Sequence, residues 1–145
     1  MIRVAINGFG RIGRSVFRVL NQRKDIDLVA INDIFDKEAL VYLLKYDTVM
    51  GRFPGNVELK DDMLTAGDQN VKLISERIPE NLPWKDLGID IVVESTGIFR
   101  QREQLQKHLN AGCSKVILTV PPKDEIDYMV VLGVNHEGLR KEHQI

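Results

Sequence analysis

The sequence lacks most of the features that mark disulfide-linked, membrane or nucleic-acid-binding proteins. It has a single cysteine, Cys113, so no internal disulfide can form. No apolar run approaches the roughly 18 residues that a membrane-spanning helix needs, and we therefore expect no membrane partner. The formal net charge is −1, so no excess of positive charge favours nucleic acid as a partner.

The N-terminus also lacks the pattern of a secretory signal peptide. Residues 1–6 suit a short strand and have no charged start, apolar centre and cleavage site in sequence. Together with the low cysteine content, this favours a cytoplasmic protein. The length of 145 residues, with 43% hydrophobic and 28% charged residues, fits one globular domain.

What is present is an alternation of short apolar runs with helical patterns. We expect strands at 2–6, 28–31, 90–94, 115–120 and 128–132, and helices at 11–22, 36–45 and 102–110. Between residues 51 and 75, glycines and aspartates separate short runs, which is typical of a small antiparallel excursion. The alternation predicts an α/β fold, with a doubly wound, mostly parallel sheet and a small antiparallel insertion.

Apolar spacing predicts which side chains face inward. They are Ile12, Val16, Val19 and Leu20 in the first helix, Leu40, Leu43 and Leu44 in the second, and Leu105 and Leu109 in the third. Asp36 is expected to cap the second helix, and Gly112 to end the third. Trp84 is expected to be a packing anchor within its loop.

Three glycines lie between the first predicted strand and the first predicted helix. Gly8 allows a tight turn, Gly10 has no side chain to keep a pyrophosphate from the backbone, and Gly13 lets the helix lie close to the strand. The backbone amides of Arg11 and Ile12 then become the natural phosphate donors at the helix N-terminus. This context predicts a Rossmann-type dinucleotide site.

An acidic residue follows at the spacing that such a site requires. Asp33 ends the second predicted strand, twenty positions after Gly13, which suits the acid that binds the adenosine ribose. Its carboxylate would repel a 2′-phosphate, so the cofactor is expected to be NAD and not NADP. The alternative is that the glycines form a structural turn and Asp33 is a solvated loop residue.

Small polar residues follow two later strands of the predicted sheet. Thr96 and Gly97 follow one, and Thr119 lies near the end of the next. Ligands of open parallel sheets bind beyond the carboxyl ends of the strands, so these residues are candidates to approach the cofactor. The pattern fits equally well hydroxyls that hydrogen-bond to neighbouring backbone.

Five stretches follow one another along the whole chain: VAINGFGRIGR, VAIND, LLKYDTVMGRF, VVESTGIF and VVLGVNHEG. Together they closely resemble the N-terminal half of glyceraldehyde-3-phosphate dehydrogenase. The resemblance implies a tetrameric, cytoplasmic, glycolytic oxidoreductase that oxidises glyceraldehyde 3-phosphate to an acyl phosphate with NAD and phosphate. It implies cofactor contacts at Asn7, Gly8, Gly10, Arg11, Ile12, Asn32, Asp33, Arg77, Thr96, Gly97, Phe99 and Thr119.

The chain departs from the family in a few places. Thr119-Val120-Pro121 stands where the family often has Ser-Ala-Pro, which keeps the hydroxyl and so the expected contact. Pro122 replaces a small residue, and Met50 stands where histidine is frequent. The sister enzyme erythrose-4-phosphate dehydrogenase tends to carry glutamate at the position of Asp33, so the aspartate favours the glyceraldehyde phosphate enzyme.

The chemistry that the resemblance implies needs a cysteine thiolate activated by a histidine. The family's nucleophile lies just beyond the stretch NHEGLRKEHQI, where this chain ends. Cys113 lies at the amino end of its predicted strand, about 20 Å of extended chain from Thr119, and is expected only to pack. We therefore expect residues 1–145 to be an NAD-binding domain without the catalytic domain, which binds NAD but does not turn over.

None of the three histidines has metal-ligand spacing with a matching cysteine or carboxylate set. Solvated or capping roles are expected for His108, His136 and His143. A second hypothesis remains for the chain as a whole, a non-catalytic nucleotide-binding or interaction module. The near-neutral charge argues against RNA as its partner.

Overall fold

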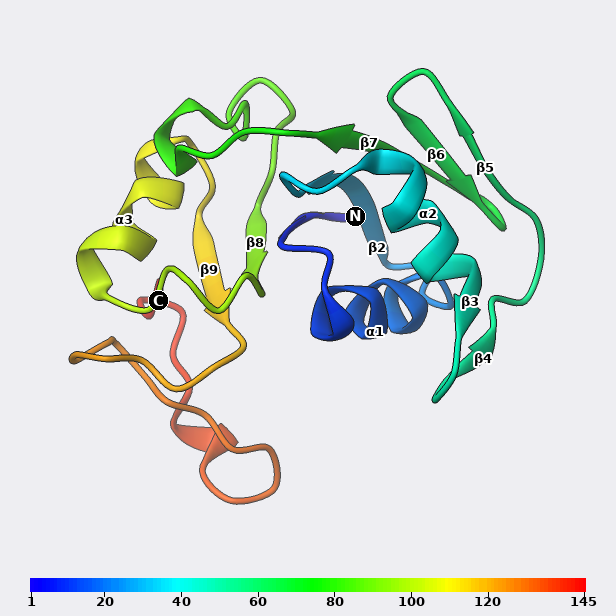
Figure 1. The fold of residues 1–145 in the computed structure, drawn as a ribbon. Helices are drawn as coiled ribbons and strands as arrows, with labels where there is room; N and C mark the ends of the chain where they lie inside the picture. The colour runs from blue at the N-terminus through cyan, green and yellow to red at the C-terminus, as the bar shows by residue number, and fades with distance from the viewer.

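The computed structural model describes all residues from 1 to 145 and builds them around one seven-stranded sheet (Figure 1). The strand order is β5-β6-β7-β2-β1-β8-β9. Their bounds are β1 (Ile2–Asn7), β2 (Ile26–Asn32), β5 (Val57–Lys60), β6 (Met63–Ala66), β7 (Gln69–Ile74), β8 (Ile91–Glu94) and β9 (Lys115–Leu118). A separate two-stranded antiparallel sheet is formed by β3 (Tyr46–Asp47) and β4 (Gly51–Arg52).

Pairing within the main sheet confirms the predicted fold class. The five strands β7, β2, β1, β8 and β9 run parallel to one another. Only β5, β6 and β7 form an antiparallel meander, and they add to the same sheet at one edge. The excursion predicted between residues 51 and 75 is therefore an extension of the sheet beyond β2.

Three α-helices, α1 (Arg11–Leu20), α2 (Lys37–Lys45) and α3 (Arg102–Asn110), and two 3-10 turns, η1 (Pro79–Asn81) and η2 (His136–Gly138), complete the fold. Asp36 caps α2 as predicted, because its carboxylate accepts the Ala39 amide at 2.9 Å. Gly112 follows α3 with φ at +115°, which is the left-handed conformation that ends many helices.

Alternate residues of the central strands enter two different cores. In β1, Val4 and Ile6 belong to the core that holds Phe17 of α1 and the inward side chains of α2, whereas Ala5 belongs to the other. That second core holds Leu105 of α3 and the fully buried Trp84. The sheet is thus covered on both faces, which explains why its central strands are apolar throughout, and Trp84 is the packing anchor that was predicted.

Of the four side chains predicted to face inward in α1, Val16 and Leu20 pack against the first core as predicted, but the other two do not. Ile12 and Val19 are 47% and 63% exposed, and Phe17 is fully buried instead. The reason is the close approach of Gly13 to the turn at Gly8. Phe17 lies four residues after Gly13 and therefore on the same face of the helix, so this contact places Phe17 toward the sheet. In α2, Leu40 and Leu44 are buried as predicted, but Leu43 is 37% exposed.

The strand predicted at residues 128–132 does not form. Its backbone groups are instead satisfied locally by Asn135, whose amide donates to the Met129 carbonyl and whose Oδ1 accepts the Val131 amide. A strand needs a neighbouring strand to pair with, and the outer edge of β9 is met by Gln144, whose carbonyl accepts the Val116 amide. As an edge strand, β9 also leaves Ile117 52% exposed.

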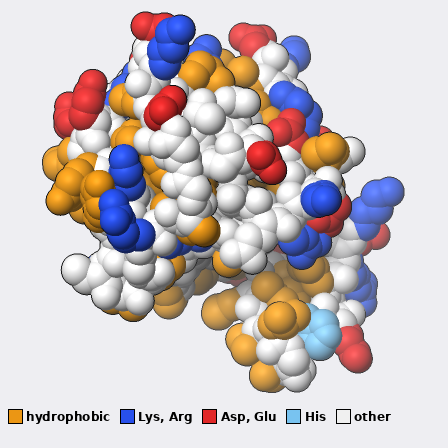
Figure 2. All heavy atoms as spheres, turned by 90° about the vertical axis from the view of Figure 1, so that its right-hand side faces the viewer, with side chains coloured by type: hydrophobic (Ala, Val, Ile, Leu, Met, Phe, Trp, Pro, Cys, Tyr) orange, Lys and Arg blue, Asp and Glu red, His pale blue; other side chains and the backbone are white.

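The segment after β9 forms a lobe and then returns toward α3 (Figure 1). Hydrophobic side chains gather on this lobe, as Figure 2 shows. Exposed ones among them are Met129, Val130, Val131, Leu132, Val134 and Leu139. None of the helices combines the length and the hydropathy of a membrane span.

One carboxylate accepts the backbone amides of the last two residues. Asp127 accepts the amides of Gln144 at 2.7 Å and Ile145 at 3.0 Å and pairs with Arg102. The Gln144 amide, above all, lowers the pKa of Asp127 from 3.8 to about 2. Because the folded state holds the ionised form, this stabilisation is complete above about pH 4 and is lost as the pH falls toward 2.

Replacing Asp127 by asparagine is expected to loosen the C-terminal segment by about 2 kcal/mol at neutral pH. Amide hydrogen exchange at Gln144 and Ile145 measures this as a loss of protection. Asp124→Asn is the control, since Asp124 accepts only the Arg102 amide. Equal loss of protection in both variants would contradict the assignment to Asp127.

Candidate functional site

A cleft of about 400 Å³ opens at the carboxyl ends of β1, β2 and β8. Residues from these strand ends, from the turn before α1 and from the segment after β7 surround it. They are Asn7, Gly8, Gly10, Asn32, Asp33, Ile34, Glu76, Arg77, Ser95, Thr96, Ile98 and Phe99. The cleft therefore lies where an open parallel sheet is expected to bind its ligand.

The turn between β1 and α1 needs glycine at two places. Gly8 has φ at +91°, and a Cβ there would lie 2.6 Å from the Thr96 nitrogen. A Cβ on Gly13 would lie 2.1 Å from the Gly8 carbonyl oxygen. Ser95 fixes the same carbonyl by donating its hydroxyl at 2.6 Å, so the turn, α1 and the end of β8 are packed against one another without space for side chains.

Gly10 is different, because it faces open space. No atom lies within 4 Å of the position that a Cβ on Gly10 would take. Gly10 is also the N-cap of α1, and no side chain caps this helix. The amides of its first turn are therefore free, and with the helix dipole they form a site for an anionic group.

Asp33 lies at the cleft with its carboxylate oriented by the turns around it. Its Oδ2 accepts the Phe9 amide at 2.6 Å and its Oδ1 accepts the Phe35 amide at 2.9 Å. The first of these bonds ties the end of β2 to the glycine turn. The carboxylate is thus fixed at the mouth of the cleft beside α1, and it is not a freely solvated loop group.

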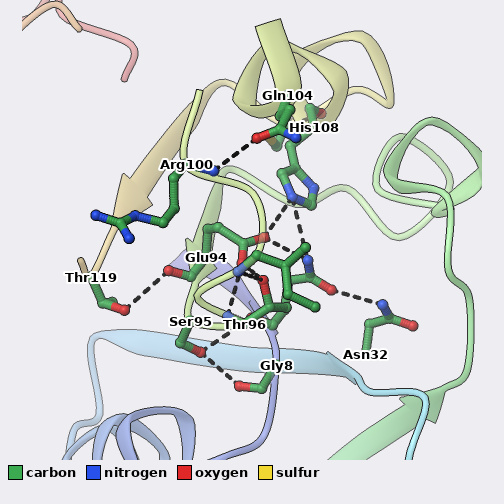
Figure 3. A network of polar contacts seen from close by, with 12 residues as sticks. Gly8, Asn32, Glu94, Ser95, Thr96, Arg100, Gln104, His108 and Thr119 are labelled. Carbon is green, nitrogen blue, oxygen red and sulfur yellow. Dashed lines mark hydrogen bonds and ion pairs between the residues drawn. The ribbon is translucent and has the colours of Figure 1, made fainter. Parts of the chain in front are cut away.

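Below the cleft lies a network of buried polar side chains (Figure 3). Asn32 donates to Asn7 Oδ1 at 2.7 Å, and Asn7 donates to Glu94 Oε2 at 2.5 Å. Glu94 in turn accepts the amide and the hydroxyl of Thr96 at Oε1, and His108 of α3 lies 2.9 Å from Oε2. Two strand ends, the loop after β8 and α3 are joined through one carboxylate.

The solvated or capping role predicted for His108 is wrong. Its side chain is fully buried, lies between Glu94 and the Trp84 indole, and accepts from the Trp84 Nε1 at 3.1 Å. Its place one turn after Leu105 on the inward face of α3 was the available signal. His136 and His143 cap nearby turns as predicted, because their Nδ1 atoms accept the Gly133 and Arg140 amides.

Cys113 packs in the second core, as predicted. It is 6% exposed, and its thiol donates to the His108 carbonyl. Burial raises the pKa of the Cys113 thiol to about 12, so it is protonated and unreactive at neutral pH. No group of three or more side chains of the metal-ligating types comes together in the structure.

The structure brings many of the predicted cofactor residues to one place. Those that line the cleft are Asn7, Gly8, Gly10, Asn32, Asp33, Arg77, Thr96 and Phe99. Arg11, Ile12 and Gly13 lie beside it in the first turn of α1, and Gly97 follows Thr96 in the loop after β8.

Thr119 is the predicted residue that lies apart. Its hydroxyl donates to the Glu94 carbonyl at 3.1 Å, and it lines a second, mainly apolar cavity of about 490 Å³ between β9 and the C-terminal segment. In this structure its hydroxyl satisfies neighbouring backbone, which is the alternative that the sequence pattern left open.

Four cleft residues were not predicted: Ile34, Glu76, Ser95 and Ile98. Ser95 and Ile34 directly follow or adjoin strand ends, so the rule for open sheets was a sufficient signal for them. Glu76 reaches the cleft only because β7 pairs with β2, and this pairing has no signal in the local sequence.

Comparison with known proteins gives a family for most of the chain. The model of the family described as "Glyceraldehyde 3-phosphate dehydrogenase, NAD binding domain" matches residues 2–102. The glyceraldehyde-3-phosphate dehydrogenase of Thermotoga maritima is 53% identical over 147 residues, which cover 100% of this chain and 44% of the relative. The cytosolic enzyme of Leishmania mexicana and the enzyme of Salmonella typhimurium are 49% and 50% identical, each over 94% of this chain and 41% of the relative. The chain thus spans less than half the length of these relatives.

Proposed function

The chain belongs to the glyceraldehyde-3-phosphate dehydrogenase family, and on that premise we propose that residues 1–145 are its NAD-binding domain and bind NAD in the cleft. One observation carries the proposal most directly. The uncapped N-terminus of α1 meets the open space at Gly10, directly beside the fixed carboxylate of Asp33. An anionic diphosphate and a sugar with two hydroxyls are complementary to this pair.

The proposal assigns a role to each group of residues. The amides of Arg11 and Ile12 hold the pyrophosphate, Gly10 lets it approach, and Asp33 accepts hydrogen bonds from the ribose hydroxyls. Arg77, with its exposed side chain, lies beside the adenine. The remaining residues of the set line the path toward the nicotinamide: Asn7, Gly8, Asn32, Thr96, Gly97 and Phe99. Thr119, which lies outside the cleft in this structure, is proposed to stand at the far end of that path.

For the whole protein we propose the reaction of its relatives. The enzyme would oxidise glyceraldehyde 3-phosphate with phosphate to an acyl phosphate, with NAD as the hydride acceptor. We propose a homotetramer and a cytoplasmic location on the same family ground. The nucleophilic cysteine and its histidine would come from outside residues 1–145, because Cys113 is buried and protonated and His108 is fully enclosed.

Titration of the purified chain with NAD tests the binding proposal. Calorimetry is expected to give saturable one-to-one binding, with weaker binding of NADP because the Asp33 carboxylate repels the 2′-phosphate. Aldehyde oxidation by the same sample is expected to be absent. A folded sample that shows no saturable binding at millimolar NAD would contradict the proposal.

A competition experiment between NAD and RNA distinguishes NAD binding from the alternative, a non-catalytic interaction module. If NAD occupies the cleft, unlabelled RNA is not expected to displace it, because the near-neutral chain has no basic stripe for a phosphate backbone. Displacement of NAD by RNA at low micromolar concentration would favour the interaction module instead.

A further inference from the structure

Three buried residues beneath the cleft have no part in the proposed NAD contacts. Trp84, His108 and Glu94 are each fully buried, and none of them lines the cleft. They continue the polar network of Asn7 and Asn32, and Figure 3 shows His108 reaching from α3 down to Glu94. The question is why the fold places a histidine and a carboxylate here.

The direction of the hydrogen bonds is fixed at the Asn32 end. The Glu76 amide donates to Asn32 Oδ1 at 2.8 Å, and Asn32 Nδ2 donates to the Glu76 carbonyl and to Asn7 Oδ1. A backbone amide can only donate, so the side-chain amide of Asn32 cannot be turned around. Asn7 must therefore accept with its oxygen and present its Nδ2 to Glu94.

The direction is fixed independently at the Trp84 end. The indole nitrogen can only donate, and it lies 3.1 Å from His108 Nδ1. Nδ1 must therefore be the unprotonated nitrogen, since an N–H there would face the indole N–H. His108 is then the neutral tautomer with its hydrogen on Nε2, which donates to Glu94 Oε2 at 2.9 Å.

The two directions converge on Glu94 Oε2, which must accept both of its bonds. Its Oε2 accepts from Asn7 and His108, whose donor nitrogens lie 3.5 Å apart, and its Oε1 contacts the Thr96 amide and hydroxyl. The carboxyl group of Glu94 is therefore held by partners from β1, α3 and the loop after β8. Two of its partners, Asn7 and Thr96, line the cleft.

We propose that Trp84 and His108 are positioning residues for the nucleotide cleft. The indole selects the Nε2–H tautomer of His108, this tautomer fixes Glu94, and Glu94 orients the Asn7 amide and the Thr96 loop at the cleft. The affinity of the cleft thus depends on residues that touch no ligand. This inference rests on the proposed function for its binding readout, but not for its structural readout.

The structural readout is the tautomer itself. Long-range ¹H–¹⁵N spectra of the imidazole at neutral pH are expected to show His108 in the parent chain as a single Nε2–H tautomer. In Trp84→Phe, which keeps an aromatic ring but removes the indole donor, Nδ1 no longer faces an N–H, and forms of His108 that carry a proton on Nδ1 are expected to become populated. A parent histidine in the Nδ1–H form or the imidazolium form, or an unchanged tautomer in Trp84→Phe, would overturn the proposal.

The binding readout compares variants of equal burial. Glu94→Gln replaces one carboxylate oxygen by an NH2 group, which then lies either against the Asn7 and His108 donors or against the Thr96 amide, and is expected to raise the Kd for NAD about tenfold or more, because a buried donor loses its partner. Trp84→Phe is expected to raise it by about threefold. Leu105→Val, in the fully buried stripe of α3 but outside the network, is the control and is expected to leave the Kd unchanged.

Combining the two substitutions separates positioning from simple loss of packing. In Trp84→Phe, His108 can present an unprotonated Nε2, so the amide of Gln in Glu94→Gln regains one acceptor. The second substitution is therefore expected to raise the Kd by a smaller factor in the Trp84→Phe background than in the parent. Multiplication of the two single effects would argue against coupling through the tautomer.

The outcomes distinguish this inference from the proposed function. If the parent binds NAD and Glu94→Gln binds it equally well, the inference fails and the proposed function stands. If the folded parent binds no NAD, the proposed function fails, and the tautomer spectra still decide whether Trp84 sets the state of His108. Should Glu94→Gln not fold, Trp84→Phe alone provides both readouts.

Discussion

Replacing Gly13 with alanine is expected to lower the free energy of unfolding by about 3 kcal/mol or more, because the new methyl group has no space. It would lie 2.1 Å from the Gly8 carbonyl oxygen and 3.1 Å from the Ser95 hydroxyl. Neither can move easily, since Ser95 holds the Gly8 carbonyl by a hydrogen bond. Urea denaturation followed by circular dichroism measures the change.

Gly10→Ala is the matched control for that prediction. The same methyl group meets nothing within 4 Å at Gly10, so the free energy of unfolding should change by less than about 1 kcal/mol, the usual effect of an altered N-cap. NAD affinity should still fall in this variant, because the methyl group occupies the space where the pyrophosphate would approach. Equal destabilisation by the two substitutions would show that the close contact of α1 with the turn is not what requires Gly13.

The second large effect is expected at Asp33. In Asp33→Gly the Kd for NAD should rise at least about tenfold, because a carboxylate that accepts hydrogen bonds from the ribose hydroxyls is lost. The Kd for NADP should change less, since removing the negative charge also removes its repulsion of the 2′-phosphate. Parallel titrations with NAD and NADP measure whether the ratio of the two Kd values becomes smaller in the variant than in the parent.

Two controls separate this charge effect from loss of loop order. Asp33→Asn keeps one oxygen that can accept the Phe9 amide but has none for the Phe35 amide, so it should retain the bond to the glycine turn but lose the discrimination against NADP. Asp36→Ala removes another aspartate that accepts a backbone amide, but outside the cleft, and should leave both Kd values unchanged. An unaltered NAD preference in Asp33→Gly would mean that Asp33 does not hold the ribose.

The order of strands and helices could be predicted closely because each element carries its own signal. The capping aspartate before α2, Gly112 after α3 and the unbroken apolar run of β8 all lie within a few residues of the structure they determine. The run at 128–132 had the same local signal as a strand but found no strand to pair with. A strand depends on a second segment of chain, and the local sequence does not record whether one is available.

The candidate site likewise contains residues that the local sequence predicts and residues that only tertiary packing brings in. Gly8, Gly10, Gly13 and Asp33 were predictable from spacing, because backbone sterics and the rise of a strand and a helix fix how far apart they must stand. Glu76 reaches the cleft through the pairing of β7 with β2, and His108 reaches Glu94 through the packing of α3 on β8 and the Trp84 loop. The residues next to Glu76 and His108 in the sequence carry no signal that predicts either contact.

The sequence by itself determined the alternating architecture, the glycine turn and the acid one strand away, since these follow from the conformational limits of consecutive residues. Only the tertiary structure decided which face of α1 is buried, where Thr119 donates its hydroxyl, and that a buried glutamate beneath the cleft joins Asn7, Thr96 and His108. The physical reason is that hydrogen-bond direction and burial depend on partners brought together from distant parts of the chain. Asn7, Glu94 and His108 are separated by up to 101 positions in the sequence, yet they meet at one oxygen atom.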